Sequence, residues 1–144
     1  MFDILCRPVH NTGELQESFN LRKKVFVEEQ GLFNKTDRDI YDKRSIHIVA
    51  LYNNKIVGTV RVYHTGAGVW YGSRLAVLKS FRGRVGKALI QKAMAIAKKK
   101  NAKHFRATVQ VRNVPLFKRI RWIPIGPVIL YRGQPHQVME ANLD

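Results

Sequence analysis

Alternation of hydrophobic and polar side chains marks several strands along the chain. Residues 105–111 alternate strictly, which is the period of a strand that buries one face. Two runs rich in β-branched residues, 46–52 and 56–64, are separated by the polar residues 53–55, a pattern typical of an antiparallel hairpin. We expect a further strand over residues 69–78, directly after two glycines break the chain.

A longer period, close to that of an α-helix, follows this last strand. Six apolar residues share one face of the helix that it predicts: Val85, Ala88, Leu89, Ala93, Ile96 and Ala97. A second helix is expected to begin at Asn11, because Glu14 stands at the spacing of a capping box. We expect this helix to run to Gln30 and to end at Gly31.

Weaker signals complete the pattern. They predict a first strand over residues 2–8, a loop or short helix over 34–45, a short helix over 112–121, and closing strands over 123–130 and 137–141 around a turn at 132–135. No repeat, low-complexity tract or linker divides the 144 residues. We therefore expect one domain over residues 1–144, of the α/β (α+β) class, built on a mixed sheet.

Charge restricts the partners of this domain. The chain carries 26 Lys and Arg against 10 Asp and Glu, a formal net charge of +16. A positive field over much of the surface favours anionic partners. Nucleic acid, an anionic membrane, a phosphorylated cofactor and an acidic carrier protein all satisfy that condition, and charge alone does not rank them.

The cysteine and histidine content excludes several kinds of site. Cys6 is the one cysteine, so an intramolecular disulfide is excluded and a reducing compartment is expected. The histidines do not stand at metal-ligand spacing with nearby acids, so we expect no catalytic metal. The first residues contain Asp3 and Pro8 and no long apolar run, which predicts no signal peptide, no membrane span and a cytoplasmic protein.

One candidate site stands out between residues 75 and 90, where an apolar strand passes through a basic turn with two glycines into the amphipathic helix. The first turn of a helix presents unpaired backbone N–H groups and the positive end of the helix dipole, which together bind phosphate. Arg82, Arg84 and Lys87 add charged donors around it. The alternative is a tight turn that Gly83 and Gly86 permit, followed by a solvated helix start.

These residues resemble a known family. Leu75, Ala76 and Val77 are similar to the central strand of the GNAT superfamily of acyl-CoA-dependent N-acyltransferases, and residues 82–89 are similar to its pyrophosphate loop, R/Q-x-x-G-x-G/A. Val85 and Lys87 stand where that motif has small residues. A loop one residue shorter fits better, which leaves open which amide meets which phosphate oxygen.

Two further segments resemble the ElaA-like branch of this superfamily through Leu21, Arg22, residues 25–27, Glu29, Gln30, Asp39, Asp42 and His47 near the start, and Gly133, Pro135, His136 and Met139 near the end. The combination of residues 72–77, 109–117 and 132–143 most closely resembles the acetyltransferase domains of bacterial nitrogen-starvation gene clusters. The resemblance implies a sheet of about six to seven strands flanked by helices. It also implies transfer of an acetyl group from acetyl-CoA to a primary amine of a small molecule or peptide.

The resemblance further implies which residues bind acetyl-CoA. The backbone of Leu75, Ala76 and Val77 would bind the pantetheine arm and polarise the thioester carbonyl. The remaining cofactor residues would be Arg82, Gly83, Arg84, Val85, Gly86, Lys87, Asn113 and Phe117. For Asn113 a simple helix cap is the alternative.

The resemblance leaves several candidates for the catalytic acid and base. Phe117 stands at the position where many relatives carry a tyrosine acid, and it has no proton to give. Water, Tyr131 or Tyr71 would then protonate the thiolate, or activity has been lost. Glu29 and His136 are the candidate bases, and a solvated carboxylate and a hydrogen-bonded turn histidine are the respective alternatives.

Two other readings remain open. Three segments also resemble acyl-homoserine-lactone synthases, whose donor would be an acidic acyl-carrier protein: residues 21–27, the acidic pair Asp39 and Asp42, and residues 70–77. Basic clusters at residues 98–103 and 118–121 would suit a non-catalytic module that binds nucleic acid, although no nucleic-acid motif accompanies them. We expect no membrane partner, and a homodimer is left open.

The acceptor is predicted from charge alone. Five acids form an expected patch on the acceptor side of a basic protein: Glu28, Glu29, Asp37, Asp39 and Asp42. Such a patch favours a cationic amine.

Overall fold

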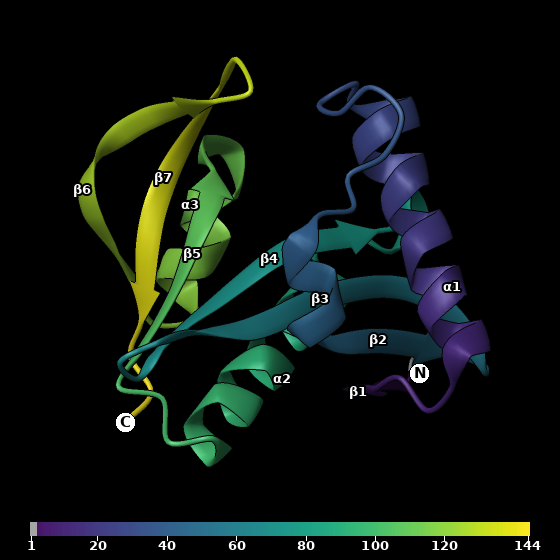
Figure 1. The fold of residues 1–144 in the computed structure, drawn as a ribbon, viewed down its shortest axis with the longest axis horizontal. Helices are drawn as coiled ribbons and strands as arrows, with labels where there is room; N and C mark the ends of the chain where they lie inside the picture. The colour runs from purple at the N-terminus through teal and green to yellow at the C-terminus, as the bar shows by residue number, and fades with distance from the viewer. Residues whose placement is uncertain (1–2) are drawn as a thin grey trace.

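A computed structural model describes residues 3–144 as a seven-stranded mixed sheet with helices on both faces (Figure 1). The strands, in the order β1-β2-β3-β4-β5-β7-β6 across the sheet, are β1 (Ile4–Pro8), β2 (Ile46–Tyr52), β3 (Lys55–Gly66), β4 (Val69–Val77), β5 (His104–Gln110), β7 (Gln134–Ala141) and β6 (Trp122–Tyr131). The α-helices are α1 (Thr12–Arg22), α2 (Arg84–Lys99) and α3 (Val114–Arg119). This architecture confirms the predicted class.

Four short helical segments connect these elements. They are the π-helix η1 (Lys23–Glu29) and the 3₁₀ segments η2 (Ile40–Arg44), η3 (Lys79–Phe81) and η4 (Val111–Asn113). The predicted helix toward Gln30 is confirmed in its extent, since the chain stays helical from Thr12 to Glu29. Its second half differs in type, because from Lys23 onward it is a π-helix. Of the predicted first strand, Phe2 lies outside the described residues.

Local signals in the sequence explain two of the turns. Asn53 and Asn54 both have positive φ, 50° and 63°, the geometry that a two-residue hairpin turn requires. Asn11 caps α1 by accepting a hydrogen bond of 2.8 Å from the Glu14 backbone N–H. In a complete capping box the Glu14 carboxylate would accept from the Asn11 backbone N–H. Here it accepts from the His10 N–H instead, at 2.7 Å.

The alternation of side chains along the strands divides the core into two layers. Ile48 packs with Leu89 and Ala93 of α2 on one face, whereas its neighbour Val49 packs with Val25 on the α1 side of the sheet. Helix α2 lies close to the sheet at β3 because Gly58 has no side chain: a Cβ there would lie 2.9 Å from Leu89.

The strands β4 and β5 are paired over a short stretch. Their parallel ladder joins Val69–Tyr71 to residues 104–106, and beyond it the two strands diverge in a V (Figure 1). A register shift in the β3–β4 ladder accompanies the divergence, and Arg74 has a positive φ of 57° there. The bulge at Arg74 bends β4 away from β5. The sheet is therefore split along its middle.

Candidate functional site

A cavity of about 330 Å³ occupies the split between β4 and β5. Residues from both strands line it, including Ser73 and Leu75 on one side and Thr108 and Gln110 on the other. Because the two strands share no ladder at this level, the cavity reaches both faces of the sheet. One part lies beneath the loop after η1, and the other lies between the sheet and α2.

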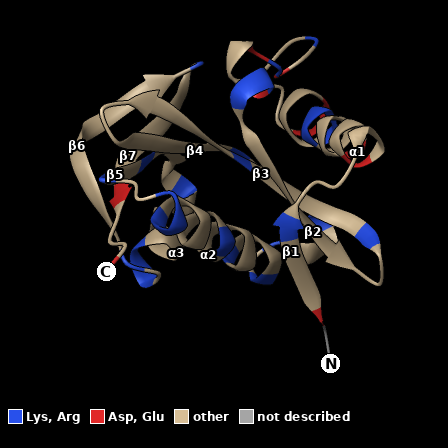
Figure 2. Cartoon of the chain, turned by 60° about the horizontal axis from the view of Figure 1, so that its bottom comes forward, with Lys and Arg blue, Asp and Glu red and all other residues tan. Residues whose placement is uncertain are grey.

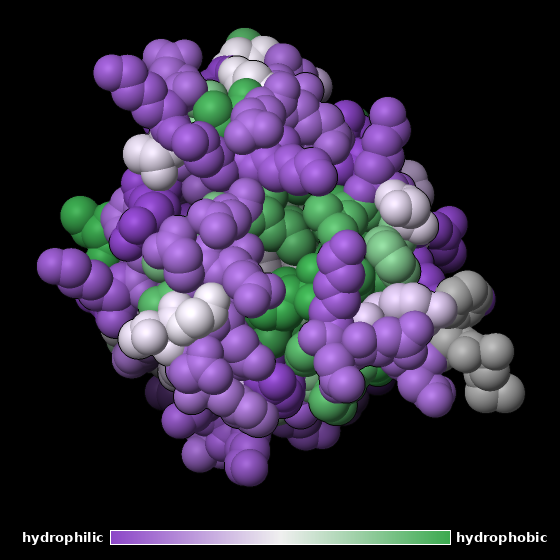
Figure 3. Space-filling view, turned by 90° about the vertical axis from the view of Figure 1, so that its right-hand side faces the viewer, coloured by the Kyte–Doolittle hydropathy of each residue, from purple (hydrophilic) through white to green (hydrophobic). Residues whose placement is uncertain are grey.

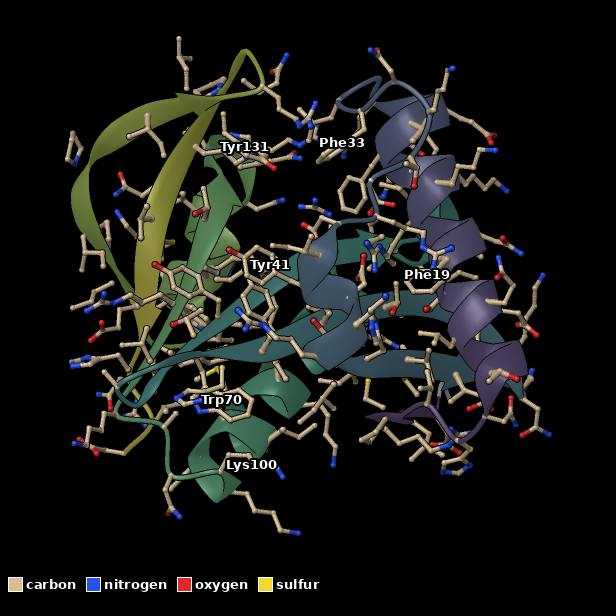
Figure 4. All side chains as sticks on the ribbon, in the orientation of Figure 1. Phe19, Phe33, Tyr41, Trp70, Lys100 and Tyr131 are labelled. Atoms are coloured by element: carbon tan, nitrogen blue, oxygen red, sulfur yellow. The ribbon has the colours of Figure 1, made fainter. Side chains whose placement is uncertain are left out.

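Aromatic side chains dominate the α1-side wall of the cavity. Tyr41 of η2 stacks on Tyr63 with ring centroids 4.5 Å apart, and Tyr63 stacks on Tyr71 at 6.2 Å. Phe33 and Tyr131 meet at 6.5 Å across the opening, where Figure 4 shows them reaching toward each other from opposite sides. This wall is rich in aromatic rings and also carries tyrosine hydroxyl groups and the charged side chains of Asp39, Arg61 and Arg74.

The part of the cavity on the α2 side is called the inner chamber, and it is lined by Ile90, Ala93, Phe105, Phe117 and Trp122. Every one of these side chains is buried. The Trp122 ring contacts Phe105 at 5.2 Å and Phe117 at 5.1 Å between centroids, so the chamber has a closed aromatic floor.

The predicted pantetheine strand supplies backbone groups to the cavity. Leu75 lines it, whereas the Ala76 and Val77 side chains are buried in the two core layers. In residues 3–144 the β5-facing edge of β4 has no strand partner beyond Tyr71. Its peptide groups on that edge need hydrogen-bond partners, and an extended ligand with amide groups can provide them.

The predicted phosphate turn forms the start of α2. Gly83 is the N-cap, with φ of 92°, and no side chain caps the helix there. The Val85 side chain is buried in the core, so only its backbone can meet a ligand. Gly86 is buried, and a Cβ there would meet Leu116 at 4.0 Å, an ordinary van der Waals contact, so a methyl group would fit. Lys87 is exposed beside it.

Arg82 and Glu29 are brought together, a pairing that sequence reasoning did not predict. Arg82 Nη2 lies 2.5 Å from Glu29 Oε2, and Arg82 Nε donates to the Val77 carbonyl at 3.1 Å. Glu29 is absent from the described lining of the split. It lines a neighbouring hollow with Gln30 and Arg112 instead.

His136 faces the cavity with one defined tautomer. Its Nδ1 lies 2.8 Å from the Gln134 carbonyl oxygen, and because a carbonyl oxygen only accepts, Nδ1 carries the proton. The neutral ring therefore keeps a lone pair on Nε2. Tyr131 packs edge to face on the same ring at 5.2 Å, and both side chains line the cavity.

Asn113, just before α3, and Phe117, within α3, also line the cavity. Asn113 occupies the N-cap of α3 but makes no capping hydrogen bond, so the alternative of a simple helix cap is not realised. Phe117 is buried against Trp122.

A network of buried charges underlies the α1-side wall. Arg22 binds Asp37 and Asp42 at 2.7 Å each, and Arg61 binds Asp42 at 2.9 Å and Asp39 at 2.6 Å. Arg74 joins both Asp37 and Asp39. Burial opposes ionisation of Asp42, but hydrogen bonds from Arg22 and the Asp39 amide outweigh it and hold the Asp42 pKa well below its usual value.

This network overturns the predicted acidic patch. Three aspartates face three arginines, and Asp37 and Asp42 are buried. The acids therefore stabilise the wall and present no excess negative charge to an acceptor. The preference for a cationic amine loses its basis.

Comparison with known proteins fixes the family. The profile of the "Acetyltransferase (GNAT) family" matches residues 13–120. The chain belongs to the GNAT acetyltransferase family. It is 30% identical over 145 residues to the Bacillus subtilis protein "Putative acetyltransferase BSU40680", with 96% of each chain covered.

Solved structures share the fold. Escherichia coli ElaA superposes with a TM-score of 0.84 at 23% identity, over 99% of this chain and 100% of ElaA. The CoA-dependent acyl-homoserine lactone synthase BjaI superposes with a TM-score of 0.77 at 18% identity, over 100% of this chain and 84% of that one. Within the described residues of this GNAT protein, no helix is long and apolar enough to cross a membrane.

The charge of this GNAT protein is distributed unevenly. Between Asp42 and Glu140 the chain contains no Asp or Glu. Figure 2 accordingly shows Lys and Arg, without acids, along α2 and α3. The side that carries α1 is mostly hydrophilic, with an apolar patch near its centre (Figure 3). The start of α2 therefore lies on a strongly positive face.

Proposed function

We propose that this GNAT protein transfers an acetyl group from acetyl-CoA to a primary amine of a small molecule or peptide. One observation carries the proposal: the unpaired edge of β4 leads directly through the turn at Gly83 into the uncapped start of α2. This arrangement matches a ligand with an amide-containing arm and a pyrophosphate at one end.

The residues present fit such a donor. The α2 amides from Arg84 to Gly86, with Lys87 nearby, would hold the pyrophosphate on the positive face. The β4 backbone at Leu75 would hold the pantetheine arm, and Asn113 would bind it from the opposite side of the split. The bound donor would supply a thioester, an acyl group activated toward amines.

His136 is the proposed general base. Transfer forms an N–C bond and breaks the thioester C–S bond, while the amine nitrogen loses one proton and the sulfur gains one. His136 Nε2 has the lone pair to accept the proton, and its Nδ1 bond to Gln134 fixes the ring. Glu29 is a weaker candidate, because Arg82 holds its carboxylate outside the split. Tyr131, in ring contact with His136, is the proposed source of the proton for sulfur.

Calorimetry with acetyl-CoA tests the donor, and thiol release with a panel of amines tests turnover. We expect binding that weakens in Lys87→Ala and is retained in Lys55→Ala, which changes an exposed lysine at the start of β3. Saturating acetyl-CoA should also raise thermal stability by a few kcal/mol, about 2.7 kcal/mol at a hundred times Kd. Absence of acetyl-CoA binding would overturn the proposal.

A second candidate is acyl transfer from an acyl-carrier protein. Its support is the positive face at α2 and α3, which suits an acidic carrier. Acetyl-CoA and an acyl-carrier protein offered in parallel distinguish the two donors. A nucleic-acid module would instead bind duplex with strong salt dependence and ignore acetyl-CoA.

A further inference from the structure

We propose that two copies of this protein pair edge to edge along the second half of β6, antiparallel about a two-fold axis. The two seven-stranded sheets would then continue into one another. This pairing does not depend on which donor or amine the protein uses. It would also bring a residue of the second copy to the wall of the cavity.

Exposed apolar side chains are concentrated on β6. Among the described residues, eight large hydrophobic side chains are exposed, and five of them belong to this one strand. They are Ile123, Val128, Ile129, Leu130 and Tyr131, and Leu130 is the most exposed of the five, at 76%. A cluster of this kind on a single chain marks a surface that a partner covers.

Both faces of β6 and its outer edge are uncovered. Ile129 and Tyr131 line the cavity, so Val128 and Leu130, which alternate with them, point to the opposite face of the sheet. β6 stands last in the sheet order, and within residues 3–144 its strand partner is β7 alone (Figure 1). Every second residue of the strand therefore directs its N–H and C=O outward, where another strand can pair with them.

The two halves of β6 differ in their ability to accept a strand. In the first half, Pro124 and Pro127 lack the N–H that a ladder needs, and a register shift with Gly126 at φ of 75° lies between Pro124 and Val128. Prolines and bulges protect a sheet edge from pairing. Residues 128–131 contain neither a proline nor a charged side chain. The pairing is therefore assigned to these four residues.

Charge favours a second copy as the partner. Molecules that each carry +16 repel one another, so they can associate only where charge is sparse. Residues 122–131 carry no charge, whereas an acidic protein would be drawn to the positive face at α2 and α3 (Figure 2). A two-fold axis places two identical strands antiparallel, so that apolar side chains meet apolar side chains on both faces.

The opposite edge of the sheet is protected, which favours a closed dimer over a fibre. Among the described residues of β1, Leu5 is the exposed large hydrophobic, and Arg7 and Pro8 follow it. Arg7 forms an ion pair with Glu14 at 2.8 Å beside this strand. Charge and proline make β1 a poor partner for β6 of a neighbouring copy. Pairing of β6 with β6 leaves no further edge to extend.

The second copy would complete the cavity wall. Ile129 lines the cavity and is still 41% exposed in the single chain. Side chains opposite each other on paired strands lie about 5 Å apart, so a residue of the partner's β6 would pack against Ile129. A standard interface covers about 800 Å² of each copy, and the apolar centre available on β6 is a small one. We therefore expect a reversible dimer that forms at micromolar concentrations.

Sedimentation equilibrium of the whole protein, from micromolar to submillimolar concentration, tests the proposal. We expect the mass to rise with concentration from 16.6 kDa toward twice that value. Added salt should strengthen the association, because it screens the repulsion between the two copies. A mass of 16.6 kDa at every concentration would overturn the proposal, and so would masses that grow beyond the dimer. None of these results depends on whether acetyl-CoA binds.

Variants at the two sheet edges locate the interface. Leu130→Lys should weaken the dimer at least about a hundredfold, because it brings like charges together across the axis. Leu5→Lys, at the exposed leucine of β1, is the matched control and should dimerise as the wild type does. Wild-type dimerisation in Leu130→Lys would contradict the pairing.

Hydrogen exchange in the wild-type protein gives a test that does not rely on the folding of a variant. Outward-facing amide hydrogens of residues 128–131 should exchange more slowly at high protein concentration, because pairing protects them. The amide hydrogens of β1 should exchange at the same rate at every concentration. Equal exchange rates for residues 128–131 at low and high concentration would contradict the pairing.

Discussion

Arg82 and Glu29 form an ion pair between the turn that precedes α2 and the end of η1, with 2.5 Å between Nη2 and Oε2. One predicted cofactor residue is thereby held by one predicted catalytic residue. Both side chains are more than a third exposed, so the pair is worth at most about 1 kcal/mol.

Releasing Arg82 should strengthen donor binding. We expect Glu29→Gln to tighten acetyl-CoA binding by up to about fivefold. In the wild type, Arg82 must give up its ion pair with Glu29 to bind the phosphate, and the variant removes that cost. Calorimetry measures the change, and Glu28→Gln, on the same segment, serves as control. A large fall in kcat for Glu29→Gln would instead make Glu29 the base.

Removing the His136 imidazole should affect the chemical step. His136→Gln is expected to lower kcat by about 10²–10⁴-fold and to leave the Kd for acetyl-CoA nearly constant, because the ring meets the amine and not the phosphate end. Steady-state kinetics and calorimetry on the same samples separate the two effects. His104→Gln, at an exposed histidine of β5, should behave as wild type. Wild-type kcat in His136→Gln would refute the assignment.

Gly86 separates a structural role from a binding role. Space exists for a methyl group there, and alanine is the better helix former, so Gly86→Ala should leave stability unchanged or raise it by about 0.5–1 kcal/mol. The methyl would obstruct the phosphate, and we expect about tenfold weaker acetyl-CoA binding, or about 1.4 kcal/mol. Thermal unfolding and calorimetry measure both. Reduced stability with normal binding would identify Gly86 as a structural glycine.

The buried charge network should be sensitive to the loss of one acid. Asp42→Asn leaves Arg22 and Arg61 without the carboxylate that they share, which we expect to cost about 3–5 kcal/mol of unfolding free energy. Urea denaturation measures it. Glu17→Gln, an exposed change on α1, should stay within about 0.5 kcal/mol of wild type. If the unfolding free energy of Asp42→Asn also stayed within about 0.5 kcal/mol of wild type, the charge network would not be needed for stability.

Acid should destabilise the protein in two stages. Burial lowers the pKa of His47, so the unfolded chain binds that proton first, and stability should fall as the pH drops below about 6.5. The Asp42 pKa is also lower in the folded state, so its contribution is present above about pH 4 and is lost as the pH falls toward the folded pKa.

Urea unfolding between pH 3 and 8 would show these stages. His47→Gln should flatten the slope between pH 7 and 5 by up to about 1.4 kcal/mol per pH unit. The steeper loss below pH 4 should persist in that variant. Equal slopes in both proteins between pH 7 and 5 would exclude His47 as the source.

The sequence predicts the turns and helix caps of this fold that are determined by residues adjacent in the chain. The Asn53–Asn54 turn and the Asn11 cap follow from the conformations those side chains favour. The sequence does not reveal that the first helix ends as a π-helix, because shifting each hydrogen bond by one residue hardly alters the pattern of apolar positions. The bulge at Arg74 gives no compositional signal, since glycine is the usual marker of positive φ.

The parts of the site that bind through backbone groups could be predicted from the sequence. A strand, a glycine turn and a helix imply their own amide groups, so the phosphate turn could be located in the sequence. Contacts between distant side chains could not: Arg22 and Asp42 are 20 residues apart, and Arg61 is 19 beyond Asp42. Nothing local shows that Asp42 is buried between them. An acid count therefore suggested a patch where the structure has paired charges.

The split in the sheet also determines how the molecule can open. Since no ladder joins β4 to β5 above the pairing of Tyr71 with Arg106, the described strands can separate there without breaking a strand-to-strand hydrogen bond. Side-chain contacts span the gap instead, among them the Gln110–Gln30 hydrogen bond and the Phe33–Tyr131 ring contact. Widening the site would break these side-chain contacts, while each half of the sheet keeps its own backbone hydrogen bonds.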